Sequence, residues 1–363
     1  ITGKKQIEAA YARGVDILED HPNPAKGYFT VLVSGDELDA LRADGYTLDV
    51  IEADWYKSYN AKSSQTMGGF LTWGEAIDKL DSFHTAFPTL TTDKFSLGLT
   101  HEGIDIWAMK ISDNPDVDEA EPEVLFTSIH HAREPISMEV VLHTMRTLLF
   151  NYGTDSDITA LVDGREVWFV PFVNPDGYIW NEITNPAGGG LWRKNRKPNA
   201  GGSFGVDPNR NYGDHWGFDN FGSSPTPTSE TYRGTAAFSE PENQHMRDFA
   251  DSRDFVIAVN FHSYSDLFLW APGWSDFYTT DEALFKAIGD TVTSFNDYVG
   301  EPGWGLYNTN GDSDDWYYFQ KGVLSFTPEV GDGTDGFWPA PSRIPTLVNE
   351  NVPGNLILID LAD

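Results

Sequence analysis

The sequence contains no cysteine at any of its 363 positions. This absence excludes Cys-rich zinc sites, thiol nucleophiles and disulfide bonds. Cationic residues are also scarce, because 24 Lys and Arg stand against 56 Asp and Glu and give a net charge of −32. A chain this negative repels nucleic acid and anionic membranes, so we expect neither as a partner. Clustered carboxylates could also bind Ca²⁺ as a second cation.

Long apolar runs are missing as well, since none approaches the ~20 residues of a transmembrane helix. No basic-then-apolar signal segment is visible at the start of the chain. At this length we expect one large core and a small accessory domain. Residues 1–54 predict a small ferredoxin-like α+β unit, lacking one strand and ending in a strand at 48–51. Residues 55–66 are typical of an exposed linker, and residues 67–363 of one large domain.

Four near-continuous apolar runs mark the large domain, and such runs are typical of strands buried on both faces of a parallel sheet. They span residues 124–129, 167–173, 255–261 and 323–328. Helical patterns alternate with them, at about 74–86, 135–151, 240–252, 280–298 and 343–361. The alternation predicts an α/β fold, with a mixed, largely parallel central sheet flanked by helices.

Polar groups follow each of these runs, at the strand ends where ligands bind in α/β sheets. The first run leads to His131 and Glu134, the third to His262 and the fourth to Glu329, while the second leads to residues 174–177. Two imidazoles and one carboxylate form a known ligand set for catalytic zinc. His130 is the competing ligand, although His131 has the better spacing. Glu329 would then be free to act as general base, the alternative being a buried carboxylate paired with an arginine.

A basic segment stands out in this acidic chain, because five of the 24 cations fall within residues 193–210. A solvated run of charge is the usual explanation for such a segment. Arginines beside a zinc site can instead bind a substrate carboxylate in bidentate fashion or stabilise a developing oxyanion.

Six ordered motifs together resemble those of the zinc metallocarboxypeptidases, the relatives of carboxypeptidases A and B. The motifs lie at residues 130–134, 174–177, 192–196, 207–211, 262–265 and 326–329. The segment 67–70 is most similar to bacterial carboxypeptidase T-like enzymes. The resemblance covers residues 67–363 and implies the metallocarboxypeptidase fold, one catalytic Zn²⁺ and an N-terminal prodomain in residues 1–54.

The resemblance also implies a role for individual residues. It makes His131, Glu134 and His262 the zinc ligands and Glu329 the general base. It assigns polarisation of the scissile carbonyl to Arg196. The remaining expected substrate-binding residues are Asn209, Arg210 and Tyr307 at the terminal carboxylate, Arg133 and Tyr264 at neighbouring subsites, Arg193 as a secondary cation, and Asp314 and Gly273 in the side-chain pocket.

An acidic residue at the position of Asp314 goes, in this family, with a preference for C-terminal Lys or Arg, and Asp312 beside it could broaden that preference. We therefore expect a secreted, monomeric proenzyme that hydrolyses the C-terminal bond of peptides and proteins. Its prodomain would cover the cleft until the chain is cut near Lys57 or Lys62. The alternatives are a peptidoglycan-peptide hydrolase or N-acyl amino acid deacylase of the same fold, and an inactive peptide-binding module.

Overall fold

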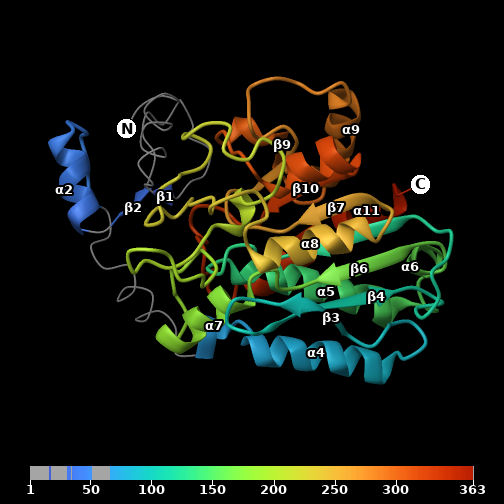
Figure 1. Ribbon diagram of the computed structural model, residues 1–363. Coiled ribbons are helices and arrows are strands. Elements are labelled where there is room, and N and C mark those ends of the chain that lie inside the picture. Colours follow the sequence, from blue (N-terminus) through green and yellow to red (C-terminus); the bar gives the residue numbers. More distant parts are fainter. Residues whose placement is uncertain (1–15, 18–30, 34, 51–65, 363) are drawn as a thin grey trace.

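The computed structural model describes residues 16–17, 31–33, 35–50 and 66–362 (Figure 1). In the N-terminal region β1 (Asp16–Ile17) pairs antiparallel with β2 (Val31–Leu32), and α2 (Gly35–Ala43) follows. The strand expected at 48–51 is wrong for residues 48–50, which have no regular secondary structure. The other expected elements of this region, and residues 55–65 of the expected linker, lie outside the described residues.

An eight-stranded sheet forms the centre of the large domain. Its order is β3-β4-β6-β5-β7-β10-β8-β9. The four inner strands β6, β5, β7 and β10 run parallel to one another, and the strands flanking them, β4 and β8, pair antiparallel. The bounds are β3 (Phe95–Leu99), β4 (Asp105–Ile111), β5 (Glu123–Thr127), β6 (Glu166–Val170), β7 (Phe255–Asn260), β8 (Leu267–Trp270), β9 (Val299–Pro302) and β10 (Leu324–Glu329).

These four inner strands are the four apolar runs of the sequence, so the predicted mixed, largely parallel sheet is confirmed. Every residue of β5 and β6 is buried, as strands covered on both faces require. Val124 and Phe126 join the core on one face, and Leu125 between them joins the core on the other.

Helices cover both faces and complete a three-layered domain. Residues of α4, α5, α6, α9 and α11 pack into the larger core, whereas α8 packs on the opposite face, in front of the sheet in Figure 1. The bounds are α4 (Trp73–Ala86), α5 (Pro135–Asn151), α6 (Ser156–Val162), α7 (Pro175–Thr184), α8 (Pro241–Asp251), α9 (Glu282–Thr293), α10 (Ser313–Asp315) and α11 (Ile344–Asp360).

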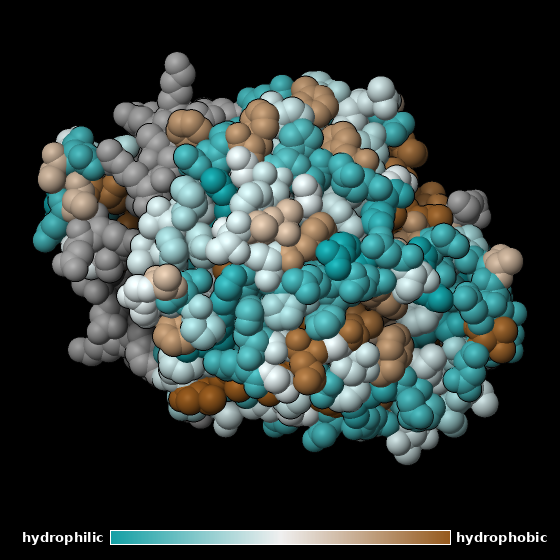
Figure 2. All heavy atoms as spheres, in the orientation of Figure 1, coloured by the Kyte–Doolittle hydropathy of each residue, from teal (hydrophilic) through white to brown (hydrophobic). Residues whose placement is uncertain are grey.

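The surface agrees with the composition. Hydrophilic residues predominate on the face shown in Figure 2, with hydrophobic ones scattered among them. None of the helices in the described residues is long and apolar enough to cross a membrane.

Candidate active site

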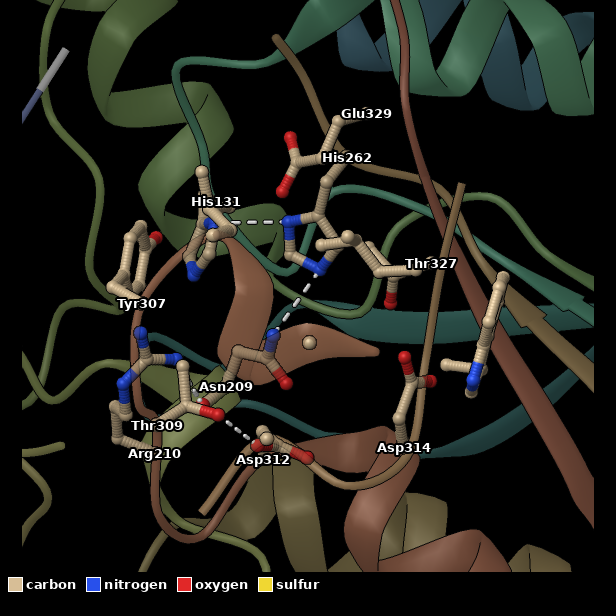
Figure 3. A pocket seen from close by; sticks show the side chains of 15 residues that line it. His131, Asn209, Arg210, His262, Tyr307, Thr309, Asp312, Asp314, Thr327 and Glu329 are labelled. Carbon is tan, nitrogen blue, oxygen red and sulfur yellow. Dashed lines mark hydrogen bonds between the residues drawn. The ribbon is translucent and has the colours of Figure 1, made fainter. Parts of the chain in front are cut away.

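Three side chains meet where β5 and β7 end. Pro135 begins α5 and leaves Glu134 outside the helix, so His131 and Glu134 share the turn after β5. His131 Nδ1 lies 2.9 Å from Glu134 Oε1 and 3.0 Å from His262 Nδ1, and His262 Nδ1 lies 2.9 Å from Glu134 Oε2. Figure 3 shows the two imidazoles turned toward each other. Glu134 and His262, which are 128 positions apart in the sequence, thus belong to one cluster.

This cluster fits a zinc ion. Its donor atoms lie 2.9–3.0 Å apart, and two imidazoles with one carboxylate are a known ligand set for catalytic zinc. Burial lowers the pKa of His262 to about 4, which keeps its imidazole in the neutral, metal-binding form. Burial opposes ionisation of Glu134, but His131 and His262 outweigh it and lower the pKa of that carboxyl.

Asp207 supports the cluster from behind and was not predicted as a site residue. Its Oδ1 lies 3.1 Å from His131 Nε2, the ring nitrogen opposite the cluster. Its Oδ2 accepts hydrogen bonds from Arg193 Nε and Nη2, at 3.1 and 2.9 Å. Burial alone would raise the pKa of Asp207, but Arg193 and His131 hold it well below its usual range. A carboxylate in this place fixes the ring orientation that a metal ligand needs.

His130 does not join the cluster. Its Nε2 lies 2.9 Å from the Tyr212 hydroxyl, and its ring stacks against His262 at 5.4 Å. Of the two adjacent histidines, His131 is therefore the one whose ring nitrogen faces Glu134.

Glu329 ends β10 directly beside the cluster. His262 N donates to Pro328 O at 2.9 Å and Val330 N donates to His262 O at 3.0 Å, so the backbone fixes Glu329 next to a candidate ligand. Burial raises the pKa of Glu329 well above its usual range, and the charge of Glu134 adds to the rise. Arg193 and Arg210 act in the opposite direction. A half-buried carboxyl with a raised pKa is typical of a general acid and base.

The structure brings Arg193, not Arg196, to this cluster. Arg193 Nη1 lies 4.0 Å from Glu134 Oε1, in addition to its pair with Asp207. The Arg196 guanidinium lies over the rings of Trp180, Trp192 and Phe204, at 3.7, 4.6 and 4.7 Å from their centres, and its Nε is 3.6 Å from Glu102 Oε1.

A pocket leads from the cluster to an acidic inner end. At its middle, Arg210 Nη1 donates to Asn209 O at 2.6 Å, and Asn209 Oδ1 accepts from Ser313 N at 2.9 Å, so both side chains are held at the wall. Figure 3 shows Glu329 and His262 at one end and the Asp312 and Asp314 carboxylates at the other. The pocket is lined by His131, Asn209, Arg210, His262, Leu269, Trp270, Gly273, Gly303, Leu306, Tyr307, Thr309, Asp312, Asp314, Thr327 and Glu329.

The inner end carries two carboxylates. Asp314 Oδ1 accepts from Asn260 Nδ2 at 2.9 Å and from Ser325 Oγ at 2.6 Å. Asp312 accepts from Asp315 N at 2.8 Å and from the Thr309 hydroxyl. Burial raises the pKa of Asp314 to about 7, with Asp312 adding to the rise, and burial also raises the pKa of Asp312.

Arg133 and Tyr264 lie outside the lining of this pocket, although each is close to a cluster residue in the sequence. The Arg133 guanidinium lies 4.0 Å from the centre of the Phe337 ring, and the Tyr264 ring lies 5.0 Å from the same ring. The two side chains therefore share one neighbour beside the site.

The turn at 174–177 shapes the site without entering it. Asn174 caps α7 and donates from Nδ2 to His130 O at 3.1 Å and Arg193 O at 3.4 Å. It thereby ties the end of β5 to the segment that carries Arg193.

Comparison with known proteins gives a consistent result. The family model for zinc carboxypeptidases matches residues 77–354. A zinc carboxypeptidase of Saccharothrix mutabilis subsp. capreolus is 35% identical over 295 residues, which are 78% of this chain and 67% of the relative. Carboxypeptidase A2 of Mus musculus is 32% identical over 291 residues, 77% of this chain and 67% of the relative.

Solved structures share the fold. The carboxypeptidase A of Helicoverpa armigera superposes with a TM-score of 0.80 at 23% identity, covering 100% of this chain and 95% of the other. The thrombin activatable fibrinolysis inhibitor also gives 0.80, at 22% identity, with 99% and 96% covered.

Proposed function

Because the chain belongs to the zinc carboxypeptidase family, we propose that it hydrolyses the C-terminal bond of peptides and proteins and accepts Lys or Arg as the released residue. One observation carries this proposal. One pocket is lined by His131 and His262 of the cluster, by Arg210, and by the Asp312 and Asp314 carboxylates at the end away from the cluster (Figure 3). A peptide C-terminus fits these groups, because its last Cα carries the nitrogen of the reacting bond, the terminal carboxylate and the side chain together.

The chain's own residues supply most of the proposed chemistry. When bound to His131, Glu134 and His262, zinc supplies Lewis-acid polarisation of the carbonyl and lowers the pKa of water. Glu329 accepts a proton from the attacking water and returns it to the leaving amine. Arg210 binds the terminal carboxylate through its planar guanidinium, helped by Asn209, and Tyr307 closes over the bound end.

We assign the stabilisation of the oxyanion to Arg193 in place of Arg196. Its guanidinium is 4.0 Å from Glu134 Oε1 and is held by Asp207, and this position beside a candidate metal ligand supports the assignment. Arg196 is enclosed by three aromatic rings and would have to leave them to reach a substrate. For Arg133 and Tyr264 we retain the neighbouring subsites.

Two carboxylates at the inner end support recognition of a basic side chain. Asp314 and Asp312 both line the pocket, and an ammonium or guanidinium group there would gain charge-assisted hydrogen bonds in a poorly solvated space. Gly273 keeps room beside them, because a Cβ at this position would lie 2.3 Å from Thr309 Oγ1 and 2.7 Å from Asp312 Oδ2.

For the rest of the chain we propose a prodomain in residues 1–54 that covers the cleft, and activation by a cut between residues 55 and 66 in a secreted monomer. The family match begins only at residue 77, which supports a separate role for the N-terminal region. Comparison of the intact chain with a chain nicked by trypsin tests this. We expect the nicked chain to be the more active, and equal activity would contradict it.

We further propose Ca²⁺ at Asp118, Glu123 and Glu166, whose ligand atoms lie within 4.8 Å of one another. Glu123 Oε2 and Glu166 Oε2 are buried without a hydrogen-bond partner. Arg253 and Lys110 contact the other oxygens of these two residues, at 3.5 and 2.8 Å. Hard oxygen ligands suit Ca²⁺, so CaCl2 should raise the melting temperature of the zinc-loaded protein more than MgCl2 does. Identical melting curves in both salts would contradict the site.

Activity on small substrates tests the main proposal. We expect the zinc-loaded protein to hydrolyse hippuryl-Arg, and hippuryl-Phe more slowly at pH 8, but not hippuryl-Arg amide, which lacks the carboxylate that Arg210 would bind. Metal analysis should give one zinc per chain, and His262→Ala should lose it. Hydrolysis of the amide at the same rate would overturn the exopeptidase assignment. Turnover of a cell-wall peptide or an N-acyl amino acid with hippuryl-Arg left intact would favour those alternatives, and zinc binding without any turnover would favour a peptide-binding module.

A further inference from the structure

The pocket offers two different surfaces to a substrate side chain. Leu269, Trp270 and Leu306 contribute apolar wall, whereas Asp312 and Asp314 contribute carboxylates. An aromatic or aliphatic side chain can use the first surface, and a cationic one needs the second. Which of the two side chains binds better depends on whether the carboxylates carry charge.

Neutral groups hold both carboxylates in place. Asp314 accepts from the Asn260 amide and the Ser325 hydroxyl. Asp312 accepts from the Asp315 backbone and the Thr309 hydroxyl. These donors lower the pKa of both acids, but burial outweighs them, so a substrate cation would be the natural counter-ion.

The titratable groups around the two acids are mostly acids themselves. Asp315 from α10 and Asp214 from the preceding loop act on Asp312. The cation among the groups that act on this end is Arg210, which lowers the pKa of Asp312 and is also needed at the substrate carboxylate. The remaining titratable groups nearby are Tyr212 and Tyr317, whose own pKa values are raised by burial, and His215, which pairs with Asp214 at 2.8 Å. Glu329, at the other end of the pocket (Figure 3), interacts electrostatically with Asp314.

We propose that protonation of Asp314 and Asp312 switches the selectivity of this pocket, from apolar C-terminal residues at low pH to Lys and Arg at high pH. The inference rests on the proposed function and adds a pH-dependent change of substrate class to it. The physical cause is burial of two carboxylates within one cavity: the second charge is costly unless a cation arrives with the substrate. Burial places the pKa of Asp314 at about 7, inside the range where such a switch can be observed.

The ratio of kcat/KM for hippuryl-Arg to that for hippuryl-Phe, measured from pH 5.5 to 8.5, tests the proposal. Because both substrates use the same metal and the same Glu329, their titrations cancel in the ratio and the pocket's titration remains. With a group of pKa about 7, the ionised fraction rises about 30-fold over this range, so we expect the ratio to rise roughly 10- to 30-fold. The pH at which the ratio has made half of its rise gives the apparent pKa of the pocket acids in the zinc-loaded protein.

Variants locate the titrating group. Asp314→Asn should give a low ratio that does not change with pH, and Asp312→Asn a smaller rise than the wild type. Asp290→Asn, which removes the same charge from the exposed surface of α9, should leave the full rise. Each variant is first checked for zinc content and for its circular dichroism spectrum.

Proton release provides a second readout that needs no variant and no turnover. By linkage, binding of free arginine should release protons near pH 7, and binding of free phenylalanine should not. Calorimetry in buffers of different ionisation enthalpy measures this directly. A flat ratio in the wild type, with both substrates hydrolysed and no proton release on arginine binding, would overturn the switch and leave the proposed function standing. Hydrolysis of neither substrate would overturn the proposed function, and the switch with it.

Discussion

Buried acids at the metal cluster and at the inner end of the pocket are in opposite electrostatic states. At the metal end the pKa values of Glu134 and Asp207 are lowered, because imidazoles and Arg193 face them and outweigh burial. At the inner end the pKa values of Asp314 and Asp312 are raised, because burial meets no comparable cation. Burial alone therefore does not decide the charge of an acid; its partner does. The first end is arranged for a resident cation, and the second for a cation brought by the substrate.

Glu329 belongs to the metal end by position but has the raised pKa of the inner end, as a group that both takes and gives a proton requires. We expect Glu329→Gln to bind zinc and lose about 10²- to 10⁴-fold in kcat, the largest loss that we expect from a substitution that keeps the metal. Steady-state kinetics and metal analysis of the same preparation measure it. If the variant keeps full activity, the base lies elsewhere; if it loses zinc, Glu329 is part of the metal site.

Arg193 and Arg196 give the next largest contrast, since they are three residues apart and contact different parts of the molecule. Arg193→Met should lower kcat about 10²- to 10³-fold, the usual effect of removing an oxyanion donor. Arg196→Met keeps the apolar contact with Trp180 and should change kcat less than about threefold. If Arg196→Met lowered kcat more than Arg193→Met does, Arg196 would be the residue that stabilises the oxyanion.

The site residues at the strand ends could be predicted from the sequence. For the basic segment, the sequence could not tell which arginine contacts the cluster. His131, His262 and Glu329 each follow an apolar run of the period and length of a buried parallel strand, and parallel strands bring their carboxyl ends to one edge. Residues 191–197 have no such regularity. Which arginine turns inward there depends on Trp180 and Phe204, which lie in other segments, and on Asp207.

Asp207 itself illustrates a second limit. Asp207 and His131 are 76 residues apart, and no fixed sequence separation relates such a supporting carboxylate to its histidine. The pair therefore cannot be recognised from spacing. Its signal lay in the motif 207–211, where Asp207 also accepts from Asn209 N at 2.9 Å and so orients Asn209 and Arg210. One residue thus supports the metal ligand and the carboxylate anchor together.

Replacing an acid by its amide should have opposite effects on stability at the two ends. Asp207→Asn removes the buried negative charge that pairs with Arg193 at 2.9 Å and should destabilise the fold by about 3–5 kcal/mol. Asp314 has a folded-state pKa above its unfolded value, so its stabilising contribution is complete below about pH 4 and is lost as the pH rises through about 7. Asp314→Asn should therefore be more stable than the wild type at pH 8 and not at pH 4. Urea unfolding at the two pH values measures both variants, and destabilisation by Asp314→Asn at pH 8 would contradict the comparison.

Gly273→Ala should have a smaller effect than Asp207→Asn and separates shape from charge at the inner end. The new Cβ would lie 2.3 Å from Thr309 Oγ1 and 2.7 Å from Asp312 Oδ2, so these two side-chain ends must move to admit it. We expect KM for hippuryl-Arg to rise at least about fivefold with kcat unchanged, since overpacking at this wall costs about 1 kcal/mol or more. The acids remain, so the rise of the Arg-to-Phe ratio with pH should persist in this variant and disappear only in Asp314→Asn. If Gly273→Ala also removed the pH dependence, the position of the Asp312 carboxylate, rather than the charge of Asp314, would control selectivity.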